Sequence, residues 1–578
     1  MATWIQDITM KNSTVNEIKR ALRIHKGAFF AVGLFSFVIN FLYLTPSIYM
    51  LQVYDRVVTA RSELTLLFLS ILTVGMFIIM GALEYTRSQI LIRVGNAIDE
   101  VLSKRVFTAT FEINLRGAGG NPAQALSDLN NVRQFVTGNG LFAFMDAPWM
   151  PIYLVVIFML HPLLGWFSVG GALLLVVLTF ITEKVSKTPL DAANRHAIAA
   201  SNFANSNLRN AEVIEAMGML QPMLKRWYAH QAKMLQQQTI ASNRASTISA
   251  LTKLVRLVIQ SGSLGLGALL VIQGSATAGV MIAASILTGR ALAPVELLIG
   301  SWKGFVSARG SYQRLLGLLQ VVPVRPENMS LPAPRGLLTL ENVYAVPPGG
   351  KLHILKGINL AILPGEVVGV IGPSASGKSS LARLMMGIWH AQIGSVRLDN
   401  AEIDQWNKSE LGPYMGYMPQ DVELFGGTVA ENIARFGPVD SDKVIQAAQL
   451  AGVHDMILHF PQGYDTPIGD GGSVLSGGQR QRIGIARAIY DLPSLIVLDE
   501  PNSNLDDMGE AALVGTVQAL KKAGKTVVVI THRMSILQAV DKLLVLRDGQ
   551  VVGYGERDQV LQALAAARQP QTAVAGQA

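Results

Sequence analysis

The sequence lacks cysteine altogether among its 578 residues. This absence excludes disulfides, a thiolate nucleophile and any metal site that depends on cysteine. Charged residues are also scarce, at 15% of the chain, whereas half of all residues are hydrophobic. The scarcity of charge is uneven, because long apolar runs fill residues 27–300 while the remainder has the composition of a soluble domain. A chain of this length and patterning predicts a membrane protein with a second, soluble domain.

The net charge is +8, but its distribution does not favour nucleic acid as a partner. The basic residues are spread through the loops instead of forming a patch with interleaved aromatic residues. We therefore expect no nucleic-acid binding, and we interpret the charge as the bias of a membrane protein towards one side of the lipid bilayer.

Six apolar segments are each close to the length of about 20 residues that crosses a bilayer. They cover approximately residues 27–53, 64–84, 139–160, 162–182, 257–274 and 276–300. The two long loops between them carry six and eight lysines and arginines, in residues 84–138 and 183–250. The positive-inside rule predicts that both termini and both loops are cytoplasmic in a multi-pass inner-membrane protein. We expect the loops to continue the membrane helices as paired rods, with turns near residues 117–122 and 218–222.

Domain boundaries follow from composition. Residues 1–26 precede the first span, and Val15, Ile18 and Leu22 share one face of a predicted amphipathic helix on the cytoplasmic membrane surface. Residues 27–322 form the predicted transmembrane domain, and residues 323–336, with four prolines, form a linker. Residues 337–568 alternate short β-branched runs with helical stretches, which predicts an α/β sheet. Residues 569–578 have neither periodicity nor bulk, and we expect a disordered tail.

The segment GPSASGKS follows the predicted strand EVVGVI and precedes the helical SLARLMMG. It matches the P-loop pattern GxxxxGK[ST], in which backbone amides surround phosphates, Lys378 reaches the β and γ oxygens and the Ser379 hydroxyl ligates magnesium. The predicted nucleotide-binding residues of this loop are Gly372, Pro373, Ser374, Ala375, Ser376, Gly377, Lys378, Ser379 and Ser380.

A second run, LIVLDE, ends in two carboxylates. A continuous apolar run is typical of a buried parallel strand, which would deliver Asp499 and Glu500 to the carboxyl edge of the sheet. Behind a P-loop, Asp499 is predicted to hold Mg²⁺, and Glu500 to orient or deprotonate the attacking water.

The most specific motif is LSGGQ at residues 475–479, directly before the predicted helix RQRIGIARAIY. Its amides, its hydroxyl and a helix N-terminus would suit an anion, although a glycine-rich turn that only caps a helix is the alternative. About residues 337–568 resemble the nucleotide-binding domain of ATP-binding-cassette (ABC) transporters. In that family the LSGGQ motif completes the ATP site of the opposite subunit, which here implicates Ser476, Gly477, Gly478 and Gln479.

The resemblance implies roles for three further residues. Gln420 in YMPQDVELF occupies the Q-loop position and is expected to ligate Mg²⁺ and assist catalysis, Asp506 lies in the D-loop sequence SNLD, and His532 in VVVITHR is the switch histidine. The cofactors implied are ATP and Mg²⁺. The aromatic residue that the family stacks on adenine would fall near Pro347, and we leave that role unassigned.

One membrane half and one cassette imply half a transporter. We expect an all-α six-helix ABC exporter transmembrane domain followed by an α/β P-loop nucleotide-binding domain, acting as a homodimer with two equivalent ATP sites. Six spans with long cytoplasmic loops ahead of the cassette resemble exporters and not importers.

Three stretches resemble one particular subfamily of ABC exporters: LTGRALAPVELLIGSWKGFVSAR, YMPQDVELFGGTVAENIARFG and LDEPNSNLD. They resemble the protease/lipase-type transporters of bacterial type I secretion systems. Such transporters export unfolded proteins with an uncleaved C-terminal signal, through a periplasmic membrane fusion protein and an outer-membrane channel protein. An exporter of lipid, glycolipid or drug shares every ATPase motif and is the alternative. Because only about 26 residues precede the first span and cysteine is absent, we expect no processing of the cargo.

Arg290 lies inside the last apolar segment, roughly 21 Å from its start at 1.5 Å per residue. A charge at that depth is expected to face the interior of the helix bundle or an aqueous cavity. One hypothesis is that Arg290 lines the polypeptide pathway, with Pro294 allowing the helix to bend. The alternative is a structural role, in which Arg290 pairs with Glu296 or extends to the membrane interface.

Overall fold

The structure is a computed structural model that describes residues 17–117, 122–208, 210–324, 330–350, 352–469, 472 and 474–568. The chain divides into two compact units: residues 1–114 and 119–323 form the first, and residues 115–118 and 324–578 form the second, so the main boundary falls between Pro323 and Val324. This boundary lies in the proline-containing segment where the sequence predicts a linker. The predicted tail at residues 569–578 lies outside the described residues.

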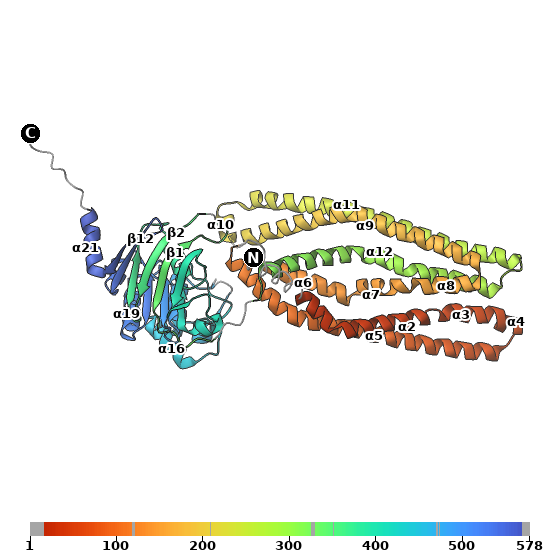
Figure 1. Cartoon of the computed structure of the whole chain (residues 1–578), viewed down its shortest axis with the longest axis horizontal. Coiled ribbons are helices and arrows are strands. Elements are labelled where there is room, and N and C mark those ends of the chain that lie inside the picture. The colour runs from red at the N-terminus through yellow and green to blue at the C-terminus, as the bar shows by residue number, and fades with distance from the viewer. Residues whose placement is uncertain are drawn as a thin grey trace, which may run out of the picture. The chain divides into compact units, whose positions relative to one another are not determined.

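The first unit is helical throughout its described residues. After a short helix over residues 17–24, its elements are α2 (Lys26–Leu42), α3 (Thr45–Gln52), the π-helical turn η1 (Val53–Val57), α4 (Val58–Ala60), α5 (Glu63–Leu115), α6 (Pro122–Thr137), α7 (Asn139–Asp146), η2 (Ala147–Trp149), α8 (Met150–Leu160), α9 (Pro162–Leu208), α10 (Ala211–Ala216), α11 (Leu220–Ile272) and α12 (Ala278–Val321). The helix α9 runs beside α11, and α12 packs against both of them and against α3, α6, α7 and α8 (Figure 1).

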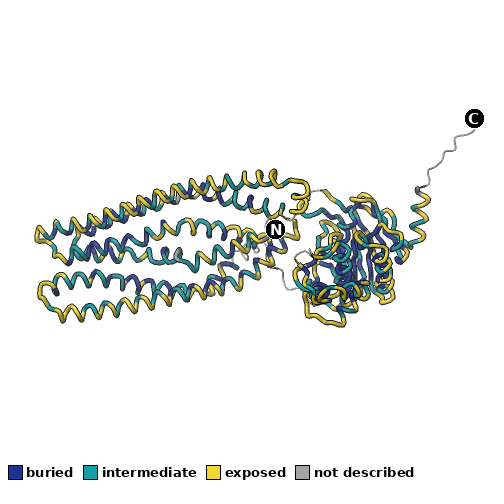
Figure 2. The backbone as a smooth tube through the Cα atoms, turned by 180° about the vertical axis from the view of Figure 1, so that it is seen from behind, coloured by how far each residue is buried: buried dark blue, intermediate teal, exposed yellow. Residues whose placement is uncertain are grey.

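Six helical stretches of the described residues are long and apolar enough to cross a membrane, which confirms the predicted number of spans. The most apolar stretch of α5 contains no buried residue at all. Many large apolar residues of these helices are exposed, among them Leu67, Phe68 and Ile78 of α5. Figure 2 shows that exposed residues run along the helices of this unit. In water such a surface would be unfavourable, so this unit is built for contact with lipid.

Four helices greatly exceed the thickness of a bilayer. The helix α5 has 53 residues and α11 also has 53, which corresponds to about 80 Å each, against about 30 Å of hydrocarbon. The predicted rods are therefore present. Gly218 has a positive φ of 62° just after α10, where the amide of Met219 closes the turn onto the carbonyl of Ile214. Gly117, with φ of 61°, follows α5, and the rest of that turn lies outside the described residues.

The predicted amphipathic helix at the N-terminus is present over residues 17–24, and part of its apolar face packs against other helices of the unit. Ile18 and Ala21 are buried in a cluster with residues of α5 and α12, among them Leu102 and Leu319. Glu17 accepts a hydrogen bond from Arg105 of α5 at 3.0 Å. The protein itself thus offers an apolar surface to this helix, and its predicted location on the cytoplasmic membrane surface stays a prediction. Val15 lies outside the described residues.

The second unit combines strands and helices. Its strands are β1 (Leu338–Ala345), β2 (Leu355–Ile362), β3 (Val367–Ile371), β4 (Ile393–Leu398), β5 (Ala401–Glu402), β6 (Met415–Met418), β7 (Gly427–Thr428), β8 (Pro467–Ile468), β9 (Leu495–Asp499), β10 (Thr526–Ile530), β11 (Lys542–Arg547) and β12 (Gln550–Glu556). Its helices are α13 (Lys378–Met385), α14 (Lys408–Leu411), η3 (Gly412–Tyr414), α15 (Val429–Ile433), α16 (Ser441–Leu450), α17 (His454–Leu458), η4 (Gly463–Asp465), α18 (Gly477–Ile489), α19 (Asp507–Lys522), α20 (Met534–Leu537) and α21 (Arg557–Arg568).

The main sheet has the order β12-β11-β3-β10-β9-β6, and its strands from β11 to β6 are parallel, as the sequence predicts. A second sheet of order β2-β1-β4-β5 is antiparallel and was not predicted. Successive residues of β10 enter opposite cores: Val527 and Val529 belong to one cluster, Val528 and Ile530 to the other. A strand that is buried on both faces reads as a continuous apolar run, and this explains the sequence VVVI.

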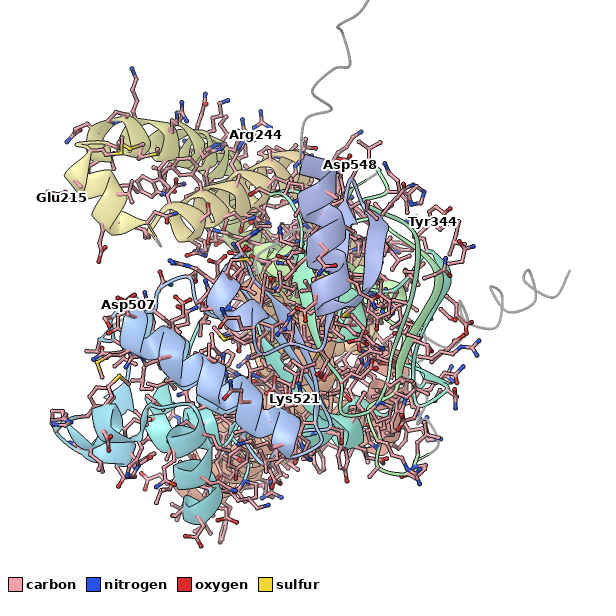
Figure 3. The ribbon with its side chains drawn as sticks, turned by 90° about the vertical axis from the view of Figure 1, so that its left-hand side faces the viewer. Glu215, Arg244, Tyr344, Asp507, Lys521 and Asp548 are labelled. Atoms are coloured by element: carbon pink, nitrogen blue, oxygen red, sulfur yellow. The ribbon has the colours of Figure 1, made fainter. Side chains whose placement is uncertain are left out.

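Helices cover the faces of this sheet. The helix α19 carries Asp507 in its first turn and Lys521 in its last, at opposite ends of the helix in Figure 3. Charges placed in this way complement the helix dipole. The four parallel strands β3, β10, β9 and β6 are neighbours, so their carboxyl ends meet at one edge. The segments that follow them contain the predicted ATPase residues.

Candidate functional site

The P-loop turns sharply between β3 and α13, and two of its glycines are required by geometry. A Cβ atom added at Gly372 would lie 2.1 Å from the backbone oxygen of Leu546. Gly377 has a φ of 99°, and a Cβ there would lie 2.9 Å from the side chain of Leu355. No larger residue fits either position without moving its neighbours. The loop therefore approaches β11 and β2 closely enough to form a narrow backbone cradle.

Lys378 begins α13 and points back into this cradle. Its Nζ donates to the backbone oxygens of Gly372 and Pro373 at 2.9 and 3.0 Å. Burial lowers the pKa of Lys378, while the nearby carboxylates of Glu500 and Asp499 oppose that shift. A desolvated ammonium group at the start of a helix, beside the turn of the P-loop, is well placed to interact with an anion.

Asp499 ends β9 and is 1% exposed. Its Oδ1 atom is buried and has no hydrogen-bond partner among the described residues. Desolvation raises the pKa of Asp499, while a hydrogen bond from the Ser379 side chain lowers it. A buried carboxylate oxygen without a donor, beside a serine hydroxyl, provides the hard oxygen ligands that Mg²⁺ prefers. The residues therefore fit the predicted cation.

Glu500 follows directly, in a left-handed backbone conformation with φ of 48°. Such a conformation is costly for a residue other than glycine, and here the amide of Glu500 donates to the carbonyl of Ile530 at 2.9 Å. The Nε2 atom of Gln420 donates to Oε2 of Glu500 at 3.2 Å, and Nε2 of His532 lies 3.7 Å from Oε1. The three residues predicted to be catalytic thus meet at one carboxylate, from three different strand ends.

The LSGGQ turn lies at the start of α18. Ser476 is the N-cap, and its hydroxyl accepts from the amide of Gln479 at 3.2 Å while its own amide donates to the Gln479 side chain at 2.8 Å. Ser476 is exposed. Among the described residues, no hydrogen bond or ion pair joins residues 476–479 to the P-loop of the same chain. The motif is thus a preformed cap that is not used by the adjacent nucleotide site.

Asp506 has a local role in this structure. Its Oδ1 atom accepts from the amide of Gly509 at 2.9 Å at the start of α19, and it forms an ion pair with Arg482. The hydrogen bond from Gly509, together with Arg482, lowers the pKa of Asp506. The side chain caps a helix, and its predicted part in nucleotide binding stays a prediction.

One residue of the site was missed by sequence reasoning. Gln481 is 1% exposed, and its Nε2 atom donates to the backbone oxygen of Glu500 and to the hydroxyl of Ser503, both at 3.1 Å. Its Oε1 atom accepts from the amide of Asn504 at 2.7 Å. The available signal was a glutamine on the same helical face as Ile485, because a buried polar group needs partners.

No aromatic residue was assigned to the adenine base, and the structure adds no assignment. Tyr344 of β1 has its ring 5.7 Å from that of His353, at an interplanar angle of 79°. The phenol is thus packed edge-on against a neighbouring ring.

The membrane unit contains a buried polar cluster of its own. Arg87 of α5 donates to Asp146 of α7 and to Ser36 of α2, both at 2.9 Å. Asn40 donates to the same oxygen of Asp146 at 3.1 Å, and the hydroxyl of Tyr153 donates to the Asn40 side chain at 2.9 Å. Charged groups at membrane depth are expected to pair within the protein in this way.

Arg290 faces the helix bundle. Its guanidinium carbon lies 4.2 Å from the centre of the Tyr43 ring, a cation–π geometry, and the Tyr43 hydroxyl donates to Glu84 at 2.7 Å. Glu296 pairs with Arg256 of α11 at 2.7 Å, so the alternative in which Glu296 is the partner of Arg290 is wrong. Six residues separate Arg290 from Glu296, which places them on different faces of α12. The helix continues through Pro294, and the predicted bend stays a prediction.

The long membrane helices, the P-loop edge and the preformed LSGGQ cap together define an ABC transporter of the exporter type. Family models agree: residues 29–292 match the ABC transporter transmembrane region, and residues 355–503 match the ABC transporter family. A bacterial Atm1-family ABC exporter solved with ATP bound has the same fold, with a TM-score of 0.81 over 96% of this chain and 100% of that one, at 21% identity.

The chain belongs to the ABC transporters of type I secretion systems, and its second unit is an ABC ATPase. It is 45% identical to the type I secretion system ATP-binding protein PrsD of Rhizobium meliloti, over 94% of this chain and 93% of the relative. The cyclolysin secretion/processing ATP-binding protein CyaB of Bordetella pertussis is 28% identical, over 94% and 77%. The leukotoxin translocation ATP-binding protein LktB of Mannheimia haemolytica is 29% identical, over 90% and 74%.

Proposed function

We propose that this chain uses ATP hydrolysis to export an unfolded protein across the bacterial inner membrane, as the homodimeric ABC component of a type I secretion system. The observation that carries this proposal is the 45% identity to PrsD over almost the whole length of both chains. The relatives CyaB and LktB carry names that refer to secretion or translocation of protein toxins, which favours a polypeptide over the alternative of lipid, glycolipid or drug.

Nucleotide binding is assigned to the P-loop. Residues 372–380 would surround the phosphates with backbone amides, and Lys378 would exchange its contacts with Gly372 and Pro373 for phosphate oxygens. Ser379, Asp499 and Gln420 are the residues that would hold Mg²⁺, and the unpartnered Oδ1 of Asp499 supports that assignment. When bound, the ion would neutralise charge on the phosphate groups.

Hydrolysis is assigned to Glu500. Its carboxylate would orient the attacking water and accept a proton from it. Gln420 and His532 would hold that carboxylate in position, which their contacts at 3.2 and 3.7 Å support. The backbone oxygen and amide of Glu500 are bonded to Gln481 and to the carbonyl of Ile530, which supports a defined backbone position for this residue before nucleotide binds.

Dimerisation would complete the site. The cap formed by Ser476, Gly477, Gly478 and Gln479 has no hydrogen bond or ion pair to the P-loop of its own chain among the described residues, and Ser476 is exposed. We assign this cap to the γ-phosphate side of the partner's site. Mixed dimers test this assignment. If one subunit carries Lys378→Ala and the other Ser476→Ala, one of the two sites is intact, and hydrolysis above that of either homodimer is expected. Equal loss in all three preparations would contradict sharing.

The orientation, the cargo and the other partners complete the proposal. Both termini and the ATPase unit would be cytoplasmic, by the charge bias of the loops. The cargo would be of the protease or lipase type with an uncleaved C-terminal signal. A periplasmic membrane fusion protein and an outer-membrane channel protein would receive it.

A secretion assay tests the function. A candidate protease would be expressed with this transporter, a fusion protein and a channel protein, with or without the C-terminal segment of the cargo. We expect secretion only with the segment present, and none with Glu500→Gln. Secretion that does not depend on the C-terminal segment would contradict the assignment of the cargo class.

A further inference from the structure

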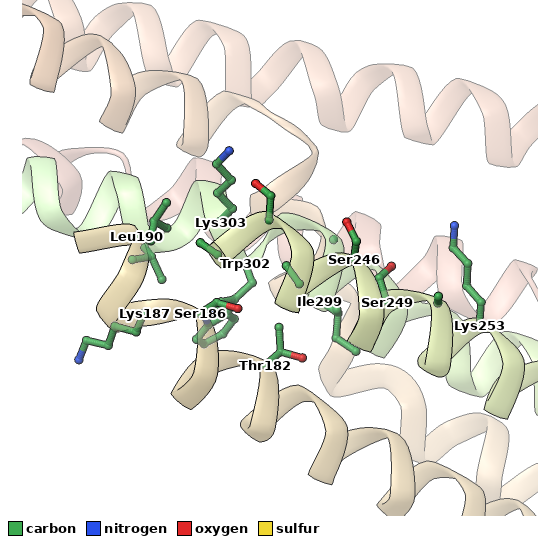
Figure 4. Close-up of a pocket in the computed structure, with 16 residues that line it drawn as sticks. Thr182, Ser186, Lys187, Leu190, Ser246, Ser249, Lys253, Ile299, Trp302 and Lys303 are labelled. Atoms are coloured by element: carbon green, nitrogen blue, oxygen red, sulfur yellow. The ribbon is translucent and has the colours of Figure 1, made fainter. Parts of the chain in front are cut away.

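The membrane unit contains a cavity of about 520 Å³, lined by residues of α9, α11 and α12 (Figure 4). Its three lysines, Lys187, Lys253 and Lys303, are exposed and point in different directions, so no charged groups converge on it. The ATPase unit differs, because polar side chains with defined hydrogen bonds lie beside the residues proposed to be catalytic. Thr531 and Asn502 are two of these, and the proposed mechanism assigns a role to neither.

Thr531 directly follows β10 and is fully buried. Its hydroxyl donates to Oδ1 of Asn502 at 2.9 Å and accepts from the amide of Arg533 at 3.1 Å. Its own amide donates to the carbonyl of Val370 in β3 at 3.3 Å. A hydroxyl has one proton to donate, and here that proton is used on Asn502. Both the backbone and the side chain of Thr531 are therefore held in place.

His532 lies between two residues that these bonds restrain. Thr531 precedes it, and Arg533, whose amide is bonded to the Thr531 hydroxyl, follows it. The side chain of His532 is 50% exposed, and its Nε2 lies 3.7 Å from Oε1 of Glu500. A threonine that accepts from the amide two residues further on forms a local turn. This turn restrains the backbone of the histidine and leaves its ring free to reach the carboxylate.

Asn502 belongs to the turn that follows Glu500. The carbonyl of Glu500 accepts from the amide of Ser503 at 3.2 Å, and Asn502 lies within the turn that this bond closes. The position of Asn502 is thus linked to that of Glu500 through two peptide bonds and one hydrogen bond. Its contact with Thr531 therefore joins the turn that carries Glu500 to the turn that carries His532.

We propose that Thr531 and Asn502 are positioning residues, whose contact sets the separation between the carboxylate of Glu500 and the ring of His532. The proposal rests on the catalytic roles proposed for those two residues. The strands β9 and β10 are hydrogen-bonded neighbours, but the turns after them are irregular and need a contact of their own to stay in register. Such support matters because a displacement of about 1 Å in a catalytic site can lower the rate about 100-fold.

Thr531→Val tests the contact, because valine has nearly the shape of threonine but neither donates nor accepts a hydrogen bond. ATPase turnover of the purified full-length protein would be measured as a function of ATP concentration. We expect kcat to fall about 10–100-fold, since displacements of up to about 1 Å have costs of this order. The KM for ATP should stay close to that of wild type. Thr531→Ser retains the hydroxyl and should recover most of the turnover.

Thr526→Val is the matched control, at the opposite end of β10. Thr526 is equally buried, and its hydroxyl donates to the carbonyl of Gly336 and accepts from the amide of Gly365, both at 3.0 Å. The same substitution therefore removes one donated and one accepted bond at each position. Both variants should lose thermal stability, because each leaves polar groups without their partners. Only Thr531→Val should lose turnover, and equal kcat values in the two variants would overturn the proposal.

A double-mutant cycle with His532→Ala shows whether Thr531 acts through the histidine. If it does, Thr531→Val should lower the residual kcat much less in the His532→Ala background than in wild type. An equal factor in both backgrounds would mean that Thr531 acts independently of His532, contrary to the proposal. Turnover in Thr531→Ser as low as in Thr531→Val would likewise show that the hydroxyl is not what matters.

Asn502→Ala removes the same contact from a less buried residue, and it serves where Thr531→Val does not fold. We expect a similar fall in kcat, and unchanged turnover would refute the positioning role. Wild-type turnover in His532→Ala would refute the role of the histidine together with the proposal that depends on it. None of these measurements uses cargo, so their outcome is distinguishable from that of the secretion assay, which tests export.

Discussion

Buried polar groups have different roles in the two units. In the ATPase unit, Asp499 is almost fully buried and one of its carboxylate oxygens has no donor. In the membrane unit, Asp146 accepts from both Arg87 and Asn40. Burial without a partner is unfavourable unless a ligand completes the site, whereas a buried charge that has its partners contributes to a defined structure. At Asp499 the missing partner, more than burial itself, indicates a bound cation.

Glu500→Gln is the largest expected effect and tests the catalytic side of the comparison. The amide can hold water but cannot accept its proton, so ATPase turnover should fall by about 10²–10⁴. ATP binding should persist, as measured by retention of a labelled nucleotide. The thermal stability of the membrane unit should not change. Turnover within a few fold of wild type would contradict the role of Glu500.

Arg87→Leu tests the structural side. Removing one member of a buried ion pair typically costs about 3–5 kcal/mol, because the remaining charge is left unpaired. We expect a clear fall in the thermal midpoint of the detergent-purified protein. The double variant with Asp146→Leu should regain much of the loss. Arg93→Leu is the control, since Arg93 is exposed on the same helix, and an equal fall in that variant would argue against a specific role of the pair.

Asp499→Asn separates stability from function at one residue. Burial raises the pKa of Asp499, so the charged form opposes folding at neutral pH, and this penalty disappears as the pH falls through the folded-state pKa. In EDTA and without nucleotide, the variant should therefore unfold at a higher temperature than wild type near pH 7. The difference should shrink in acid, and ATPase activity should be lost. A lower midpoint at pH 7 would contradict the assigned penalty.

Arg290→Ala is expected to have the smallest effect on stability, about 0.5–2 kcal/mol from the lost contact with the Tyr43 ring. Basal ATPase activity should remain, while secretion per folded dimer should fall if Arg290 lines the pathway. Arg290→Lys keeps the charge but loses the planar group, so partial rescue would indicate a field effect. Normal secretion by a folded Arg290→Ala protein would contradict the pathway hypothesis, and Glu296→Ala serves as a control at a residue that pairs elsewhere.

The ATPase site could be predicted from sequence because its parts follow strands. Each of Lys378, Asp499 and Gln420 lies within a few residues of a strand end, and neighbouring parallel strands deliver such residues to one edge. Local sequence was sufficient to predict that edge. Gln481 was not identified because its partners, two backbone groups and the Ser503 hydroxyl, lie about 20 residues away, which no local pattern reveals.

The membrane unit was predictable only in outline. The number of spans and the long rods follow from hydropathy and length. The partners of Arg87 and Arg290 come from other helices, and helix periodicity does not specify which faces meet. The N-terminal helix shows the same limit, because an apolar stripe containing Ile18 fits protein as well as lipid.

The position of Gln481 on α18 has a consequence for how two subunits would work together. In the proposed dimer, Ser476 would contact the partner's nucleotide, while Gln481 holds the carbonyl of Glu500 in its own chain. Five residues of helix separate them, a rise of about 7.5 Å. This short, rigid start of α18 would thus connect the two ATP sites of the dimer mechanically. Closure of one site around its nucleotide would shift the position of the catalytic base in the other site. The two ATP sites of the dimer would therefore be coupled and would not hydrolyse ATP independently.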